Sequence, residues 1–188
     1  ADADYAVALG HRASANGHDG AFVAADQSTT DSLEASANNQ FNTRYAGGYR
    51  LFTNATTTTG VSLNAGGSSW NVISDRNAKE NFLGIDGEEI LSRIRGLPLS
   101  TWNYIAEGRQ VRHIGPMAQD WHRAFGLNED DRTINSGDFD GVNLAAIQAL
   151  EARTAELRAA QAQLAEKSNK IDELEARLAR IEALLRQR

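Results

Sequence analysis

The sequence has no cysteine, two prolines and three lysines among its 188 residues. Without cysteine the chain forms no disulfides, has no thiolate nucleophile and cannot ligate zinc through sulfur. No stretch approaches the ~18 apolar residues of a membrane-spanning helix, so no membrane span is expected in this sequence. Segments 1–73, 74–143 and 144–188 have net charges of −3, −4 and +1, which argues against a nucleic-acid partner.

Signals for a metal or a cofactor are equally sparse. His11 and His18 lack an acidic partner at ligand spacing and are expected in surface turns. The acidic loop 128–131 lacks the spaced ligands and the glycine of a calcium-binding EF-hand, which favours a solvated turn. We therefore expect no metal and no cofactor. The sequence begins without methionine, which we interpret as the carboxyl-terminal part of a longer protein.

The first 73 residues contain few bulky side chains and many turn formers. Two apolar triplets, Ala8–Gly10 and Ala21–Val23, lie thirteen residues apart, which is typical of the coils of a short-strand β-roll. Residues 27–40 are expected to form a loop. Alternating segments bounded by glycine then predict hairpin strands at 40–45, 49–53, 61–63 and 70–73. Such a section closes too small a core by itself, so we expect it to intertwine with copies of the chain.

Residues 74–143 change to helical periodicity and carry both prolines. Gly96 and Pro98 are expected to end the first helix of this part. The second helix has large apolar residues four apart, more typical of a core than of a ligand site: Met117, Trp121 and Phe125. The spacing predicts a helix at 87–95, strands at 99–104 and 111–115, and a helix at 116–125.

From Gly141 to its end the chain is predicted to be one helix. Seam residues alternate at spacings of three and four, as in a heptad repeat, over 147–171 and again over 174–185. The step from Ile171 to Leu174 is three where four is due, which predicts local overwinding of a supercoil. Leucine at a and isoleucine at d near the end favour three or four strands over two. A helix of about 60 Å is too long for a single-chain domain, so partner helices are expected from other copies.

The junction between the first two parts reads Ser74-Asp75-Arg76-Asn77-Ala78-Lys79-Glu80-Asn81-Phe82. Lys79 is the only lysine in the first 166 residues and follows Ser74 by five positions. A neutral amine can take a proton from a serine hydroxyl, whereas guanidinium stays protonated, so this pair suits a Ser-Lys proteolytic site. The same residues also suit a structural role, because Ser-Asp before a helical run is a common N-cap.

Four blocks of the sequence resemble the peptidase S74 family in order and spacing. This family is the carboxyl-terminal intramolecular chaperone of phage tail spikes and fibres, endosialidases and bacterial surface proteins. The blocks are the junction 74–82, Leu97-Pro98-Leu99-Ser100-Thr101-Trp102-Asn103-Tyr104, Ile114-Gly115-Pro116-Met117-Ala118-Gln119-Asp120, and Gly141-Val142-Asn143-Leu144 before the heptads. The resemblance covers about residues 74–188, and the segment before it is similar to trimeric stalks and adhesin heads.

The resemblance implies an α+β protein that forms an intertwined homotrimer. A β-rich stalk, similar to a β-roll or β-prism, would span 1–73, the chaperone domain 74–143, and a trimeric coiled coil 144–188. The chaperone would bring three chains into register, fold the upstream stalk as its client, and then cut itself off. The implied location is a phage tail fibre or spike, or a bacterial cell surface, with the chaperone domain released after cleavage.

The family's catalytic serine and lysine map onto Ser74 and Lys79. Ser74 would attack a neighbouring carbonyl, with that of Ile73 favoured, and Lys79, neutral through burial at the trimer interface, would take the proton. Backbone amides at the start of the following helix would hold the oxyanion. Whether the bond between Ile73 and Ser74 or that between Ser74 and Asp75 breaks stays open.

Two alternatives remain on the sequence alone. One is an uncut structural fibre tip, the same trimer with Ser74 serving only as a helix cap. The other is a membrane-tethered transcription factor, because animal examples carry a similar chaperone domain. The acidic β-roll and the lack of a DNA-binding module disfavour this last class.

Overall fold

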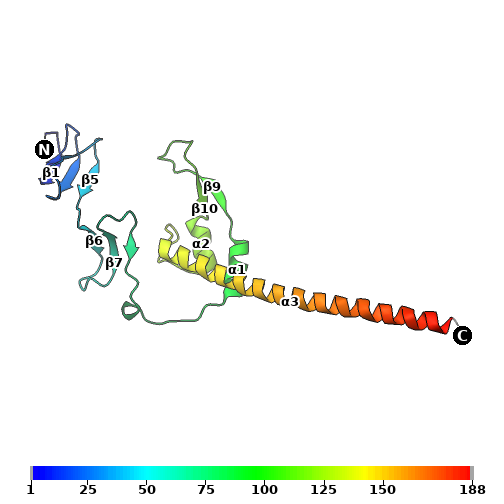
Figure 1. The fold of residues 1–188 in the computed structure, drawn as a ribbon. Coiled ribbons are helices and arrows are strands. Elements are labelled where there is room, and N and C mark those ends of the chain that lie inside the picture. Colours follow the sequence, from blue (N-terminus) through cyan, green and yellow to red (C-terminus); the bar gives the residue numbers. More distant parts are fainter. Residues whose placement is uncertain (1, 187–188) are drawn as a thin grey trace. The chain divides into compact units, whose positions relative to one another are not determined.

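The computed structural model describes residues 2–186 and is drawn in Figure 1. The chain divides into two compact units, Ala1–Phe82 and Leu83–Arg188. Among the described residues, the first unit contains short strands and one 3₁₀ turn, and the second contains three helices and a hairpin. The fold is therefore mixed α+β, as predicted, and the junction residues 74–82 all lie in the first unit.

The first unit begins with a small parallel β-roll. Its strands are β1 (Val7–Gly10), β2 (Ala13–Ser14), β3 (Phe22–Ala25), β4 (Leu33–Glu34) and β5 (Phe41–Arg44). One sheet has the order β1-β3-β5 and a second pairs β2 with β4, all in parallel. The core between them is small because it consists of one valine and three alanines: Ala15, Ala21, Val23 and Ala35.

Three expectations for this region were wrong in detail. Val7 pairs with Phe22, so the first coil repeats after fifteen residues and not thirteen. Phe22 in turn pairs with Phe41, because the second coil has a longer connection. That connection contains β4 within the segment expected to be a loop, and β5 joins the parallel sheet instead of opening a hairpin.

A three-stranded antiparallel meander follows the β-roll. It consists of β6 (Gly48–Phe52), β7 (Gly60–Asn64) and β8 (Asn71–Val72), in the order β6-β7-β8. The Asn54 side chain organises the threonine-rich turn between β6 and β7, because its Oδ1 accepts from the amides of Thr58 and Thr59. The hairpin strands predicted from 49 to 72 are confirmed.

One apolar face of the first unit is open to solvent. A groove of about 560 Å³ runs along it, lined by side chains from β1, β3, β5, β6 and β7. Phe22 and Phe41 stack in this groove with ring centroids 5.2 Å apart, yet Phe41 remains 73 % exposed. Leu51 and Trp70 on the same face are more than half exposed. This is a large apolar surface for a unit whose own core is built mainly from alanine.

The β-roll depends on close backbone approach at Gly10. Gly10 has φ +90°, and a Cβ there would lie 2.0 Å from the carbonyl oxygen of Ala25. We expect Gly10→Ala to destabilise the unit by more than the ~1–2 kcal/mol of a left-handed backbone alone, because the strands must also separate. Gly17→Ala is the matched control, since Gly17 has φ +73° with open space around it. Urea unfolding of both variants measures the difference, and equal losses would contradict the steric explanation.

The second unit is built around the place where its three helices meet, which we call the helical corner. Its elements are α1 (Gly87–Gly96), β9 (Ser100–Trp102), β10 (His113–Gly115), α2 (Ala118–Phe125) and α3 (Ser136–Leu185). β9 and β10 pair antiparallel. The predicted helices and hairpin of this unit are confirmed. α3 begins five residues before the predicted Gly141, because Asn135 caps it by accepting from the amides of Gly137 and Asp138.

The core of this unit lies where α1, α2 and the first turns of α3 meet. Trp121 is 1 % exposed, and its ring centroid lies 4.5 Å from that of Phe125 and 5.1 Å from that of Phe139 on α3. Leu91 of α1 is also buried. Gly87 allows α1 to lie close to α3, because a Cβ there would be 2.8 Å from the Cβ of Ala149.

Beyond this core α3 continues alone (Figure 1). The helix has 50 residues, which corresponds to about 75 Å. Its large apolar seam residues are all more than half exposed within the single chain, from Ile147 (62 %) and Leu150 (51 %) to Leu185 (66 %). The coiled coil therefore stays a prediction, and this exposed apolar stripe supports it.

Candidate active site at the junction

The junction is a single 3₁₀ turn that follows the meander. The amide of Ile73 donates to the carbonyl of Gly60 at 3.1 Å, which continues the pairing of β8 with β7 by one residue. The 3₁₀ helix η1 (Arg76–Ala78) then begins. Its cap is Asp75, whose carboxylate accepts from the Asn77 amide at 2.9 Å and from Asn77 Nδ2 at 3.1 Å. The cap predicted for the serine is thus made by its neighbour, and the Ser74 hydroxyl is left out of it.

The turn brings the two candidate catalytic side chains together. Lys79 Nζ donates a hydrogen bond to Ser74 Oγ at 2.6 Å. Residues five apart do not face each other on an α-helix, where neighbours are three or four apart. Here the meeting is possible because η1 makes only one turn and Lys79 then adopts extended backbone angles, φ −127° and ψ 152°.

Several amides of the turn already have acceptors. The Asn77 amide binds the Asp75 carboxylate, the Ala78 amide binds the Asp75 carbonyl, and the Lys79 amide binds the Arg76 carbonyl. Of the backbone donors in this turn, those of Asp75 and Arg76 are left for an oxyanion. Within this turn, these two amides are therefore the candidates for the expected oxyanion site.

The junction is open to water in the single chain. Ile73 is half-buried, whereas Ser74, Asp75 and Lys79 are exposed. In this setting the lysine is a hydrated donor to the hydroxyl. To accept the proton of the Ser74 hydroxyl instead, the Lys79 amine must be neutral, and exclusion of water would favour the neutral form.

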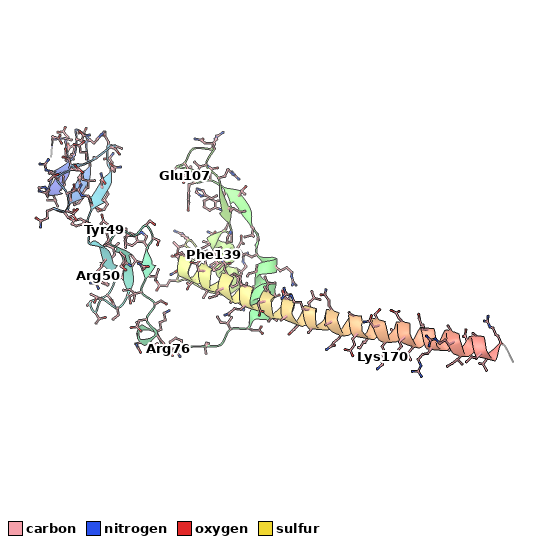
Figure 2. All side chains as sticks on the ribbon, viewed as in Figure 1. Tyr49, Arg50, Arg76, Glu107, Phe139 and Lys170 are labelled. Atoms are coloured by element: carbon pink, nitrogen blue, oxygen red, sulfur yellow. The ribbon has the colours of Figure 1, made fainter. Side chains whose placement is uncertain are left out.

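One stabilising contact at the junction was not predicted. The Arg76 guanidinium lies 5.0 Å from the centroid of the Phe82 ring, a cation–π contact that folds the end of the segment back onto the turn. Arg76 is labelled in Figure 2. An arginine six residues before a phenylalanine carries no periodic signal, so only the turn geometry reveals the pair.

The described residues offer little for other chemistries. Among residues 2–186, no group of three or more histidine and acidic side chains is placed to hold a metal ion. In the acidic loop, Asp130 accepts from the amides of Arg132 and Thr133 and from the Thr133 hydroxyl, and these bonds lower the pKa of Asp130. Within the same residues, no helix combines the length and the apolar character needed to span a membrane.

Comparison with known families gives one match. Residues 74–127 match the Peptidase_S74 family model, which is described as the chaperone of endosialidase. The match begins at Ser74, extends through the hairpin and ends just after α2. No curated protein matches the chain. The family resemblance found in the sequence blocks is confirmed over this segment.

Proposed function

Because residues 74–127 match the Peptidase_S74 family of endosialidase chaperones, we propose that the chain is an intramolecular chaperone that finally cuts itself. The match supports a chaperone role and, in general, a self-cleaving peptidase. The finer proposal is that the chain forms a homotrimer, that the upstream β-rich segment is its client, and that Ser74 and Lys79 sever the backbone. The observation that carries it is the 2.6 Å contact between Lys79 Nζ and Ser74 Oγ.

The reaction follows from the two groups. Lys79 Nζ, once neutral, takes the proton of the Ser74 hydroxyl while Oγ attacks the carbonyl carbon of Ile73. The C–O bond forms, the C–N bond to Ser74 breaks, and the released amine of Ser74 takes up a proton. Water then hydrolyses the ester, which leaves a carboxylate on Ile73 and returns the Ser74 hydroxyl. The backbone donors of Asp75 and Arg76 stabilise the charge on the former carbonyl oxygen.

Assembly would control this reaction. In the single chain Ser74 and Lys79 are exposed, so the amine is hydrated and poorly suited as a base. The apolar groove of the first unit and the exposed seam of α3 both favour association of copies. If neighbouring copies exclude water from the junction, cutting follows correct folding. Loss of the chaperone domain then removes the route from the folded stalk back to its unfolded state, and the stalk becomes kinetically trapped.

The match to a family of endosialidase chaperones supports a phage-related surface structure as the proposed location. We propose that the client belongs to a phage tail fibre or spike, or to a bacterial surface protein, and that the chaperone domain is released from it. The alternative is an uncut fibre tip. The Asp75 cap favours this alternative, because it shows that the junction also forms an ordinary capped turn.

Intact mass spectrometry of the purified, folded chain separates the two functions. Cutting before Ser74 yields residues 1–73 and 74–188, and cutting after it moves one serine residue from the second fragment to the first. We expect one of these pairs, with the first favoured by attack on Ile73. A stable trimer by light scattering that keeps its full mass would exclude self-cleavage and leave the uncut fibre tip.

A further inference from the structure

The contact between Lys79 and Ser74 depends on a backbone turn that is weak by itself. A lysine side chain in an exposed position has many rotamers, and few of them reach the serine. The Ala78 amide donates to the Asp75 carbonyl, and the Lys79 amide to the Arg76 carbonyl, both at 3.2 Å. A single 3₁₀ turn with two such bonds is not stable alone in water. Side chains must therefore help to hold it.

Two neighbouring side chains supply this support. Asp75 Oδ1 accepts from the Asn77 amide at 2.9 Å and from Asn77 Nδ2 at 3.1 Å. Asp75 also accepts from the Ala78 amide through its carbonyl oxygen. Three donors of the turn therefore converge on Asp75. A cap requires only the backbone donor, so the bond from the Asn77 side chain goes beyond ordinary capping.

The carbonyl that Ser74 would attack is held separately. The Ile73 amide donates to the Gly60 carbonyl at 3.1 Å, which fixes Ile73 at the end of the meander. Ser74 thus follows an anchored strand end and precedes an anchored turn. Loosening the turn would move Lys79 relative to Ser74 and leave Ile73 in place. A displacement of about 1 Å between reacting groups can cost about 100-fold in rate.

The charge of Asp75 does not help the proposed reaction. Asp75 directly follows the serine that the Lys79 amine contacts, and a carboxylate near an amine favours the protonated form of the amine. The proposed base is the neutral amine. The presence of an acid at this position is therefore better explained by the hydrogen bonds that it accepts than by its charge.

We propose that Asp75 and Asn77 are positioning residues for self-cleavage, whose side-chain pair holds the turn on which Lys79 reaches Ser74. The inference rests on the proposed function, because it concerns the same reaction. It assigns the two residues no chemical step, since they act through the backbone of the turn. Both side chains are exposed, so they can be replaced without disturbing a core.

Two substitutions at Asp75 separate position from charge. Both remove the carboxylate, but asparagine keeps an oxygen that caps about as well as that of aspartate. We expect Asp75→Ala to lower the maximum rate of cutting at least about ten-fold. Asp75→Asn should keep the maximum rate within about two-fold of the unmodified chain. Intact masses taken over time after refolding, at a series of pH values, give the rates. A positioning defect lowers the maximum of this profile, whereas a charge effect moves the profile along the pH axis.

Asn77 is tested by the same measurement. Asn77→Ala removes the bond from Nδ2 and keeps the bond from the amide, so a smaller loss of roughly three-fold is expected. Asn77→Asp keeps the size of the side chain but places a second carboxylate against that of Asp75, and should be slower than Asn77→Ala. Because Asn77→Ala changes least, it keeps the test decisive if Asp75→Ala fails to assemble. Two Asn77 variants that cut at the full rate would exclude a positioning role for Asn77.

Asp86→Ala is the matched control. Asp86 caps α1 in the second unit through Oδ1, which accepts from the amides of Glu88 at 2.9 Å and Glu89 at 3.2 Å. Its replacement removes a similar cap from another element and should leave the rate of cutting unchanged. Light scattering of every variant must first give the mass of the unmodified oligomer.

The outcomes separate this inference from the proposed function. An unmodified chain that is never cut overturns both. If the unmodified chain is cut and Asp75→Ala keeps the full rate, only the positioning role is overturned. Asp75→Asn as slow as Asp75→Ala would also overturn it, because the carboxylate would then be required for its charge. Asp86→Ala as slow as Asp75→Ala would do the same, because the effect would be a general loss of stability.

Discussion

Replacing Ser74 by alanine is expected to leave one full-length species where the unmodified chain yields two fragments. Without Oγ no ester can form, so the loss should be complete within the time of the assay. Lys79→Arg is expected to lower the rate on the order of 10³-fold or more, because guanidinium keeps the charge and the hydrogen-bonding ability but cannot accept a proton. Denaturing gels and intact masses taken over time after refolding measure both effects.

Lys79→Arg is the more informative variant, because it keeps the positive charge of the side chain but removes its ability to act as a base. Lys167→Arg is its matched control, since it makes the same substitution at a lysine far from the junction in sequence and should leave cutting unchanged. Light scattering of each variant must give the mass of the unmodified oligomer, which excludes a failure of assembly. If Lys79→Arg cuts as fast as the unmodified chain, the lysine is not the base, and the 2.6 Å contact with Ser74 is structural.

The sequence identified the two side chains of the junction but not how they meet. The scarcity of lysine and the family blocks both selected Ser74 and Lys79, and these are features of residue identity. The geometry depends on a 3₁₀ turn that is capped by Asp75 and followed by extended backbone at Lys79. Helical spacing rules cannot predict this arrangement, because a five-residue separation brings two side chains together only when the helix stops after one turn.

The fold, too, could be predicted from the sequence only in part. The helices were predicted because α1 and α2 carry a helical apolar period and α3 carries a heptad repeat. The start of α2 was placed two residues too early, and that of α3 five residues too late, because Asn135 caps α3. The register of the β-roll was missed because its coils differ in length, fifteen residues from Val7 to Phe22 and nineteen from Phe22 to Phe41. A core of alanines gives little periodic signal from which to detect such unequal repeats.

Trp121→Ala is expected to cost the second unit about 3–5 kcal/mol, a large fraction of the ~5–15 kcal/mol that stabilises a typical protein. Trp121 is 1 % exposed and its ring lies against those of Phe125 and Phe139, so it joins α2 to the first turns of α3. Its indole nitrogen is buried and has no hydrogen-bond partner among the described residues. The loss should therefore come from packing, and Trp121→Phe should cost much less than the alanine variant.

The measurement is urea unfolding at a fixed chain concentration, because association contributes to the apparent stability. Met117→Ala, at the N-cap of α2, is the matched control, since Met117 is already 37 % exposed and its loss should cost well under half as much. If this corner orients α3, Trp121→Ala should also prevent assembly and, through it, cutting at Ser74. A Trp121→Ala chain that still assembles and cuts normally would show that the helical corner is not required for either step.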